Sequence, residues 1–227
     1  MTIMNEDVDS HLEDYPNWAY LLHEWELLYR HGSAGGSSAI RGHRRRVRET
    51  LSKIVDSNPR IKKRPNLDLP VTAHLQRAID LGNRNVLSGM SCALDRIKHC
   101  LTWEYGYERI SKSLASKYGY CEVVGPQGPI VSNTLTLGFV LFAPNTTYPQ
   151  HSHQDIEESY ISLAGAWSEN DQAVYAPGSL ILNKPGKAHR ITTGQFDPCL
   201  LAYAWIGPGE KLLNPKMKFT RTREKLR

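Results

Sequence analysis

The sequence is poor in cysteine and has no long apolar run. It contains no CxxC pair, so a thiolate zinc site is not expected. No stretch approaches the roughly 20 apolar residues that a membrane-spanning helix needs. The acidic beginning, MTIMNEDVDSHLEDYP, lacks the basic start and apolar core of a secretory signal. We therefore predict a cytoplasmic protein with no membrane partner, whose thiols stay reduced at Cys92, Cys100, Cys121 and Cys199.

The basic residues outnumber the acidic ones and give a formal net charge of +5. They concentrate at residues 41–48, at residues 62–64 and in the tail KMKFTRTREKLR. Basic clusters can bind nucleic acid, but the chain has no zinc-finger spacing and no aromatic signature of an RNA-binding domain. We interpret the clusters as solvated faces and expect no nucleic-acid partner.

The first half of the chain has the periodicity of helices, and the second half has that of strands. Apolar spacing predicts helices over residues 17–30, 41–55, 72–81, 86–97 and 103–118. From residue 119, short alternating segments are separated by turn-forming pairs such as Pro177-Gly178 and Pro185-Gly186. Many short strands with regular turns are typical of a sandwich or small barrel. We predict a helical N-terminal extension over 1–118, a β-barrel over 119–210 and a basic tail over 211–227.

Candidate metal ligands concentrate in the segment YPQHSHQDIEESY, residues 148–160. Side chains alternate along a strand, so His151 and His153 point to the same face. A glutamate follows, and His189 is the only later histidine. Burying these groups without partners would be costly, and a metal ion would compensate. Such ligands suit zinc, manganese, iron, cobalt or nickel. We predict one divalent ion per chain, with zinc as the first candidate.

Two adjacent glutamates could complete this site. Glu157 keeps the strand parity of the two histidines, whereas Glu158 keeps that of Tyr160, and a β-bulge after His153 would bring Glu158 to the histidine face. Tyr160 would then lie beside the metal. A nearby cation lowers the pKa of a phenol from about 10, so that its phenolate can act as a general base.

The spacing of these residues resembles the first cupin motif: His-x-His, four residues, Glu158, six residues and then Gly165. The segment from Pro177-Gly178 to His189 resembles the second motif. The resemblance implies a mainly β fold, the cupin double-stranded β-helix or jelly-roll barrel with a helical N-terminal extension. It favours Glu158 over Glu157, and it implies a ligand set of His151, His153, Glu158 and His189.

With Tyr160 two residues after Glu158 and Tyr148 just upstream, the pattern further resembles the cupin dimethylsulfoniopropionate (DMSP) lyases. Length and helical extension are most like the DddL branch. The resemblance implies a carbon–sulfur lyase (dimethylpropiothetin dethiomethylase) that forms dimethyl sulfide and acrylate by β-elimination. It implies Tyr160 as the catalytic base and Tyr148 as the residue that orients the substrate carboxylate. A homodimer is expected by the same resemblance.

A sulfonium substrate needs an aromatic, poorly hydrated wall. The candidates in the barrel segment are Trp167, Tyr175, Tyr203 and Trp205. Two other functions stay open. Another cupin metalloenzyme, such as an iron dioxygenase or a sugar isomerase, would use the same ligands, although a dioxygenase would consume oxygen. A ligand-sensing regulator would use the arginine-rich helix after residue 40 on DNA.

Overall fold

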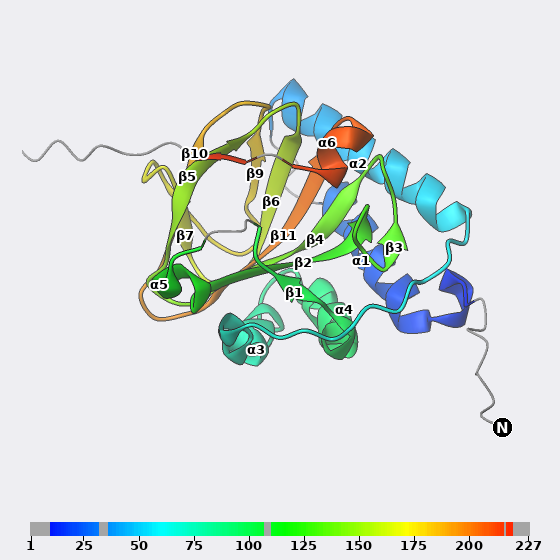
Figure 1. The fold of residues 1–227 in the computed structure, drawn as a ribbon, viewed down its shortest axis with the longest axis horizontal. Coiled ribbons are helices and arrows are strands. Elements are labelled where there is room, and N and C mark those ends of the chain that lie inside the picture. Colours follow the sequence, from blue (N-terminus) through cyan, green and yellow to red (C-terminus); the bar gives the residue numbers. More distant parts are fainter. Residues whose placement is uncertain (1–9, 32–35, 107–109, 216, 220–227) are drawn as a thin grey trace, which may run out of the picture.

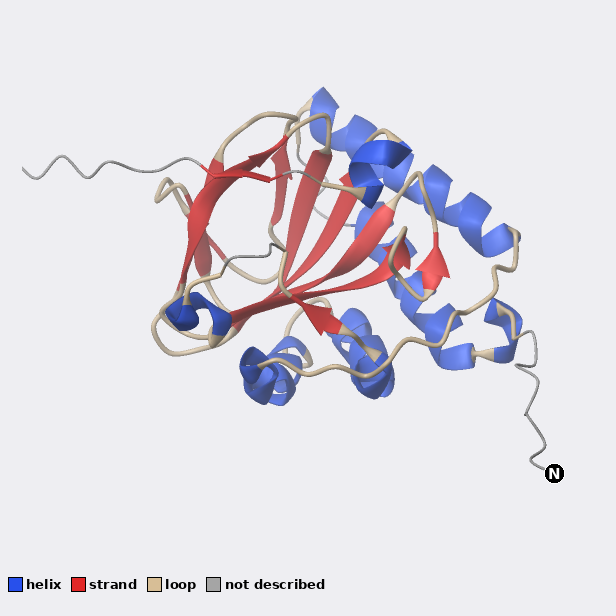
Figure 2. Ribbon diagram, in the orientation of Figure 1, coloured by secondary structure: helices blue, strands red, loops and turns tan. Residues whose placement is uncertain are grey.

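The computed structural model describes residues 10–31, 36–106, 110–215 and 217–219 of the 227-residue chain. Two mainly antiparallel sheets form a barrel, and the N-terminal helices cover one side of it (Figures 1 and 2). Within these ranges, no helix is long and apolar enough to cross a membrane.

The helices of the first hundred residues form the outer layer. Their positions confirm the helices predicted from residues 17 to 97. Ser37 caps α2, because its hydroxyl accepts a hydrogen bond from the Ile40 amide at 3.3 Å. The elements are η1 (Leu12–Asp14), α1 (Pro16–His31), α2 (Ser38–Asp56), η2 (Pro70–His74), α3 (Leu75–Gly82), α4 (Ser88–Ile97) and η3 (Lys98–Cys100).

The predicted helix over residues 103–118 is wrong. This stretch contains strand β1 (Trp103–Glu104) and the short helix α5 (Lys112–Ala115), and strand β2 begins at Tyr118; residues 107–109 lie outside the described ranges. Trp103 pairs with Cys121 in the sheet and is buried there. Burial on a sheet outweighed the weak helical spacing of this aromatic segment.

The larger sheet has the order β1-β2-β4-β11-β6-β9, with β3 beside β2. The smaller sheet has the order β12-β5-β10-β7-β8. The short helix α6 (Gly209–Leu213) follows β11. The remaining strands are β2 (Tyr118–Gly125), β3 (Ile130–Val131), β4 (Thr136–Phe142), β5 (Thr147–His153), β6 (Glu157–Ala164), β7 (Trp167–Glu169), β8 (Val174–Tyr175), β9 (Leu180–Asn183), β10 (His189–Thr193), β11 (Cys199–Ile206) and β12 (Met217–Phe219).

Part of the segment expected to be a basic tail belongs to the barrel. Strand β12 pairs with β5, so that Met217 lies opposite His153 and Phe219 lies opposite His151. The division of the chain into three parts remains a prediction, but these residues of its last part extend the smaller sheet.

The larger sheet separates two cores. Alternate residues of β4, including Leu137 and Phe139, face the helices, and Phe139 packs against Trp25 of α1. The opposite face of the same sheet points Phe142, Tyr160 and Tyr203 into the barrel. This two-residue alternation places an apolar core outside the sheet and an aromatic core between the two sheets.

Candidate metal centre

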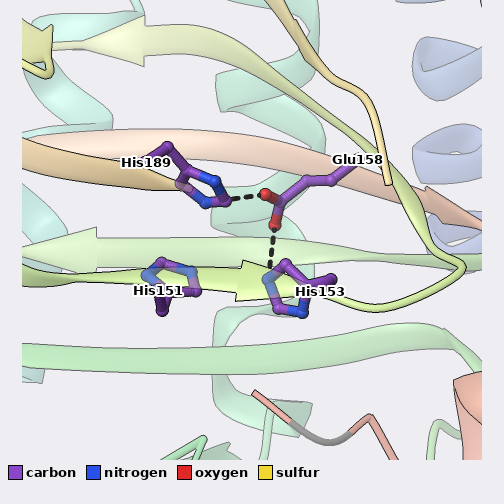
Figure 3. Close-up of side chains that lie close together, drawn as sticks. All are labelled: His151, His153, Glu158 and His189. Atoms are coloured by element: carbon purple, nitrogen blue, oxygen red, sulfur yellow. Dashed lines mark ion pairs between the residues drawn. The ribbon is translucent and has the colours of Figure 1, made fainter. Parts of the chain in front are cut away.

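Three strands bring the four predicted ligands together (Figure 3). His151 on β5 lies directly opposite His189 on β10, and their ring centroids are 4.2 Å apart. His153 lies on the same face as His151, and Glu158 reaches the group from β6 in the other sheet. All four side chains are buried, and one candidate ligand atom from each lies within 4.8 Å of the others.

A turn, and not the predicted β-bulge, brings Glu158 to the histidines. His153 ends β5 and Glu157 begins β6, and Asp155 between them has a φ of +62°. The alternation of side chains along β5 therefore does not continue into β6. Glu158 points into the barrel, whereas the Glu157 carboxylate lies 2.5 Å from His43 of α2, on the helical side.

Hydrogen bonds orient the ligand atoms. The Nδ1–H groups of His151 and His189 donate to the backbone carbonyls of Pro149 and Lys187 at 3.0 and 3.3 Å, which directs both Nε2 atoms toward the cluster. The indole N–H of Trp205 donates to Glu158 Oε1 at 2.7 Å. Glu158 Oε2 lies 3.0 Å from His189 Nε2. Hydrogen bonds thus orient His151, His189 and Glu158.

The charges within the cluster favour an ionised glutamate. Burial opposes ionisation, but the imidazoles of His153 and His189 hold the pKa of Glu158 well below its usual range. Burial alone would lower the pKa of His189, yet the neighbouring Glu158 carboxylate raises it. Burial lowers the pKa of His151 to about 3, so that its ring is neutral at physiological pH.

The cluster fits a divalent cation. Both ring nitrogens of His153 are buried and lack a hydrogen-bond partner among the residues that the structure describes. Such groups are costly unless another ligand satisfies them. Three imidazole nitrogens and one carboxylate oxygen are a suitable donor set for a transition-metal ion. The group could therefore hold one metal ion.

Three of the four candidate ligands, His151, His153 and Glu158, line a cavity whose walls are largely aromatic. Of the aromatic residues predicted for the site, Tyr148, Tyr160, Tyr203 and Trp205 line it. Tyr160 is buried two residues after Glu158, with its ring centroid 6.2 Å from that of His189. The cavity thus combines three candidate ligands with the phenols of Tyr148 and Tyr160 and an aromatic wall.

The structure does not bring Trp167 and Tyr175 to this cavity. Their rings pack against each other with centroids 5.1 Å apart, and the Trp167 indole donates to Ser162 at 3.2 Å. Sequence reasoning missed Tyr118, Tyr120 and Met217, which do line the cavity. The segment YGY offered a signal for Tyr118 and Tyr120, because residues two apart on a strand point to the same face. No local signal marked Met217, which lies on β12.

Two solved structures show the class of fold. The DMSP lyase DddQ from Ruegeria pomeroyi DSS-3 aligns with a TM-score of 0.68 and 19% identity, over 91% of this chain and 97% of that one. A structure from work on the DMSP lyases RdDddP and RnDddQII aligns with a TM-score of 0.66 and 19% identity, over 91% and 98%. Together with the barrel and its ligand cluster, this shows that the chain has the cupin fold.

Sequence comparisons narrow the class to one family. The family model of dimethylsulfoniopropionate lyase matches residues 43–201. A relative from Cereibacter sphaeroides, described as a candidate dimethylsulfoniopropionate lyase DddL, is 62% identical over 225 residues, which span 99% of this chain and 97% of the relative. The chain belongs to the dimethylsulfoniopropionate lyase family, and is thus a carbon–sulfur lyase.

Proposed function

We propose that this chain is a metal-dependent enzyme that cleaves DMSP into dimethyl sulfide and acrylate. The observation that carries the proposal is a buried group of four candidate ligands, three of which line a cavity together with Tyr160 and Tyr148. Family membership and the name of the 62% identical relative supply the substrate.

The metal would be held by His151, His153, Glu158 and His189, with zinc as the first candidate. When bound, a divalent cation supplies positive charge that attracts the substrate carboxylate, acidifies the adjacent C–H bond and favours a nearby phenolate. The buried donor set and the hydrogen bonds that orient it support this assignment.

Tyr160 would act as the base. Burial and the neighbouring Glu158 carboxylate raise the pKa of its phenol well above the usual value, so a compensating positive charge is needed before it can ionise. As phenolate, Tyr160 takes the proton from the α-carbon. The C–H electron pair becomes the new C=C bond, the β-carbon–sulfur bond breaks, and dimethyl sulfide leaves as a neutral molecule.

Tyr148 would orient the substrate carboxylate. Its hydroxyl lies 3.3 Å from that of Tyr118, and its ring centroid is 4.9 Å from that of His151. A phenol placed between another hydroxyl and a candidate ligand can donate a hydrogen bond to a carboxylate bound beside the metal. Tyr148 thus binds substrate without removing the proton.

The sulfonium group would bind the aromatic wall. The Tyr203 centroid lies 5.3 Å from that of Trp205 and 6.5 Å from that of Tyr120. The electron-rich faces of such rings attract a weakly hydrated cation. We assign this role to Tyr120, Tyr203 and Trp205, and not to Trp167 or Tyr175.

Headspace detection of dimethyl sulfide tests the function. Purified protein is treated with a chelator, reloaded separately with zinc, manganese, iron, cobalt or nickel, and given DMSP under anaerobic conditions. We expect equal amounts of dimethyl sulfide and acrylate from metal-loaded protein and almost none from the chelated form. Full turnover by chelated protein would refute the metal requirement, and no product with any ion would refute the lyase function. The cytoplasmic location and the homodimer remain predictions, for fractionation and sedimentation to test.

A further inference from the structure

A fully buried histidine lies outside the cavity, on the helical side of the larger sheet. The buried stripe of α2 consists of His43, Val47 and Leu51, at four-residue spacing. Val47 and Leu51 join the apolar core, but His43 places an imidazole where an aliphatic side chain would satisfy the helical pattern. Its position therefore needs an explanation other than apolar packing.

Both ring nitrogens of His43 contact strand β6. Nδ1 lies 2.5 Å from Glu157 Oε1, and Nε2 lies 2.8 Å from the Ser159 hydroxyl. A carboxylate can only accept, so Nδ1–H donates to Glu157, and in the neutral ring Nε2 then accepts from the Ser159 hydroxyl. The Ser159 hydroxyl is also 2.7 Å from that of Tyr29 on α1, which donates to it. Burial lowers the pKa of His43 although Glu157 opposes the shift, in keeping with this neutral tautomer.

The two partners of His43 on β6 flank the candidate ligand Glu158. Because side chains alternate along a strand, Glu157 and Ser159 point to the helices while Glu158 points into the barrel. Arg46 of α2 also pairs with Glu157. The helical layer thus holds the strand by the residues immediately before and after the ligand, and Tyr160 is the next residue on the inner face.

We propose that His43 is a positioning residue that fixes the β6 backbone so that Glu158 is aimed at the three histidines. The proposal rests on the proposed function insofar as Glu158 is a metal ligand. A fully satisfied buried network specifies one arrangement of the elements it joins. The proposal gives the N-terminal helices a role at the site, although none of them lines the cavity.

Zinc affinity, measured by chelator competition without substrate, tests the proposal. His43→Leu removes both hydrogen bonds and replaces the imidazole with an apolar side chain of comparable size. Val47→Ala is the matched control, because it alters the same buried stripe one turn away without touching the network. Loss of a group hydrogen-bonded directly to a metal ligand typically lowers metal affinity about 10–100-fold. Because His43 contacts the residues on either side of Glu158, we expect zinc affinity to fall by up to about 10-fold in His43→Leu. It should be unchanged in Val47→Ala. In the lyase assay, kcat should fall more than KM changes.

Further variants separate positioning from folding. Ser159→Ala removes the hydroxyl that joins His43 to Tyr29, whereas Tyr29→Phe removes only the bond between Tyr29 and Ser159. Both variants keep the contact between His43 and Glu157, so each should weaken zinc binding less than His43→Leu does. His43→Gln retains one donor and one acceptor and should restore part of the affinity. Wild-type zinc affinity in folded His43→Leu, or in both Ser159→Ala and Tyr29→Phe if His43→Leu does not fold, would overturn the proposal. If His153→Ala also binds zinc normally, the metal site itself is wrong.

Discussion

The two faces of the larger sheet use the same strands for different purposes. Phe139 and Phe142 both lie on β4, and both are fully buried. Phe139 packs against Trp25 in the apolar core beneath the helices, whereas Phe142 contacts Tyr118 and Tyr148 in the cavity. The outer face anchors the sheet, and the inner face supplies the chemistry. Burial by itself does not distinguish a structural residue from a functional one.

Strand β6 shows that the two faces are connected. Its inner residues Glu158 and Tyr160 belong to the candidate site, while Ser159 between them binds Tyr29 and His43 from the helices. A polar network thus interrupts the apolar outer core opposite the candidate ligand. The comparison predicts that most substitutions on the outer face alter only the stability of the fold. Substitutions in this polar network should also affect the candidate site.

The largest effect is expected from losing a metal ligand on the inner side. His153→Ala or His189→Ala should lose the metal and nearly all turnover, because the loss of one of the four donors weakens the binding of the ion. Elemental analysis of the purified variants measures the metal directly. His99→Ala, which changes an exposed histidine of the helical layer, should keep both. Full occupancy in either ligand variant would show that the assignment is wrong.

Removing the proposed base should separate metal binding from chemistry. Tyr160→Phe keeps the ring but lacks the hydroxyl, and a positioned general base contributes about 10²–10⁴-fold to rate. We expect turnover to fall by that factor while metal content stays normal. Tyr20→Phe on α1 is the control outside the barrel. Near-normal turnover in Tyr160→Phe would eliminate this residue as the base.

Acid should release the metal. Glu158 raises the pKa of His189, so this ring begins to gain a proton above the ordinary histidine value of about 6.5. A protonated imidazole cannot bind a metal ion, and lower pH therefore favours the metal-free site. Metal content after desalting at pH 8, 7, 6 and 5 should decline in that order. Unchanged occupancy at pH 5 contradicts the expectation.

A smaller effect is expected where an aromatic residue orients a ligand. Trp205→Phe keeps a ring beside His153 but loses the N–H that donates to Glu158. We expect metal affinity to fall about 10-fold. Trp167→Phe is matched to it, since that indole donates to Ser162 and not to a candidate ligand. Equal metal affinities for the two variants would show that this hydrogen bond does not support the site.

The smallest effect on activity is expected on the outer face. Phe139→Leu and Phe142→Leu remove the same atoms from one strand, and each should lower the free energy of unfolding by about 1–3 kcal/mol. Only Phe142→Leu should change KM, because only Phe142 lines the cavity. Denaturant unfolding and steady-state kinetics test this pair. A changed KM in Phe139→Leu would break the proposed division between the faces.

Local periodicity in the sequence was sufficient to predict much of the fold. Helical spacing predicted α1 to α4, and alternation with turn pairs predicted the barrel. Strand geometry placed His151 and His153 on one face. The helix predicted over residues 103–118 is wrong because Trp103 is buried by pairing with β2, which a local pattern does not reveal.

The sequence by itself therefore determined which residues could form strands, helices and a metal site. Only the tertiary structure decided which of Glu157 and Glu158 faces the histidines, because a turn between β5 and β6 interrupts the alternation of side chains. It also placed Tyr118, Tyr120 and Met217 at the cavity in preference to Trp167 and Tyr175. The physical reason is that alternation fixes a side chain's face relative to its own strand, whereas the pairing and packing of distant strands decide what that face meets.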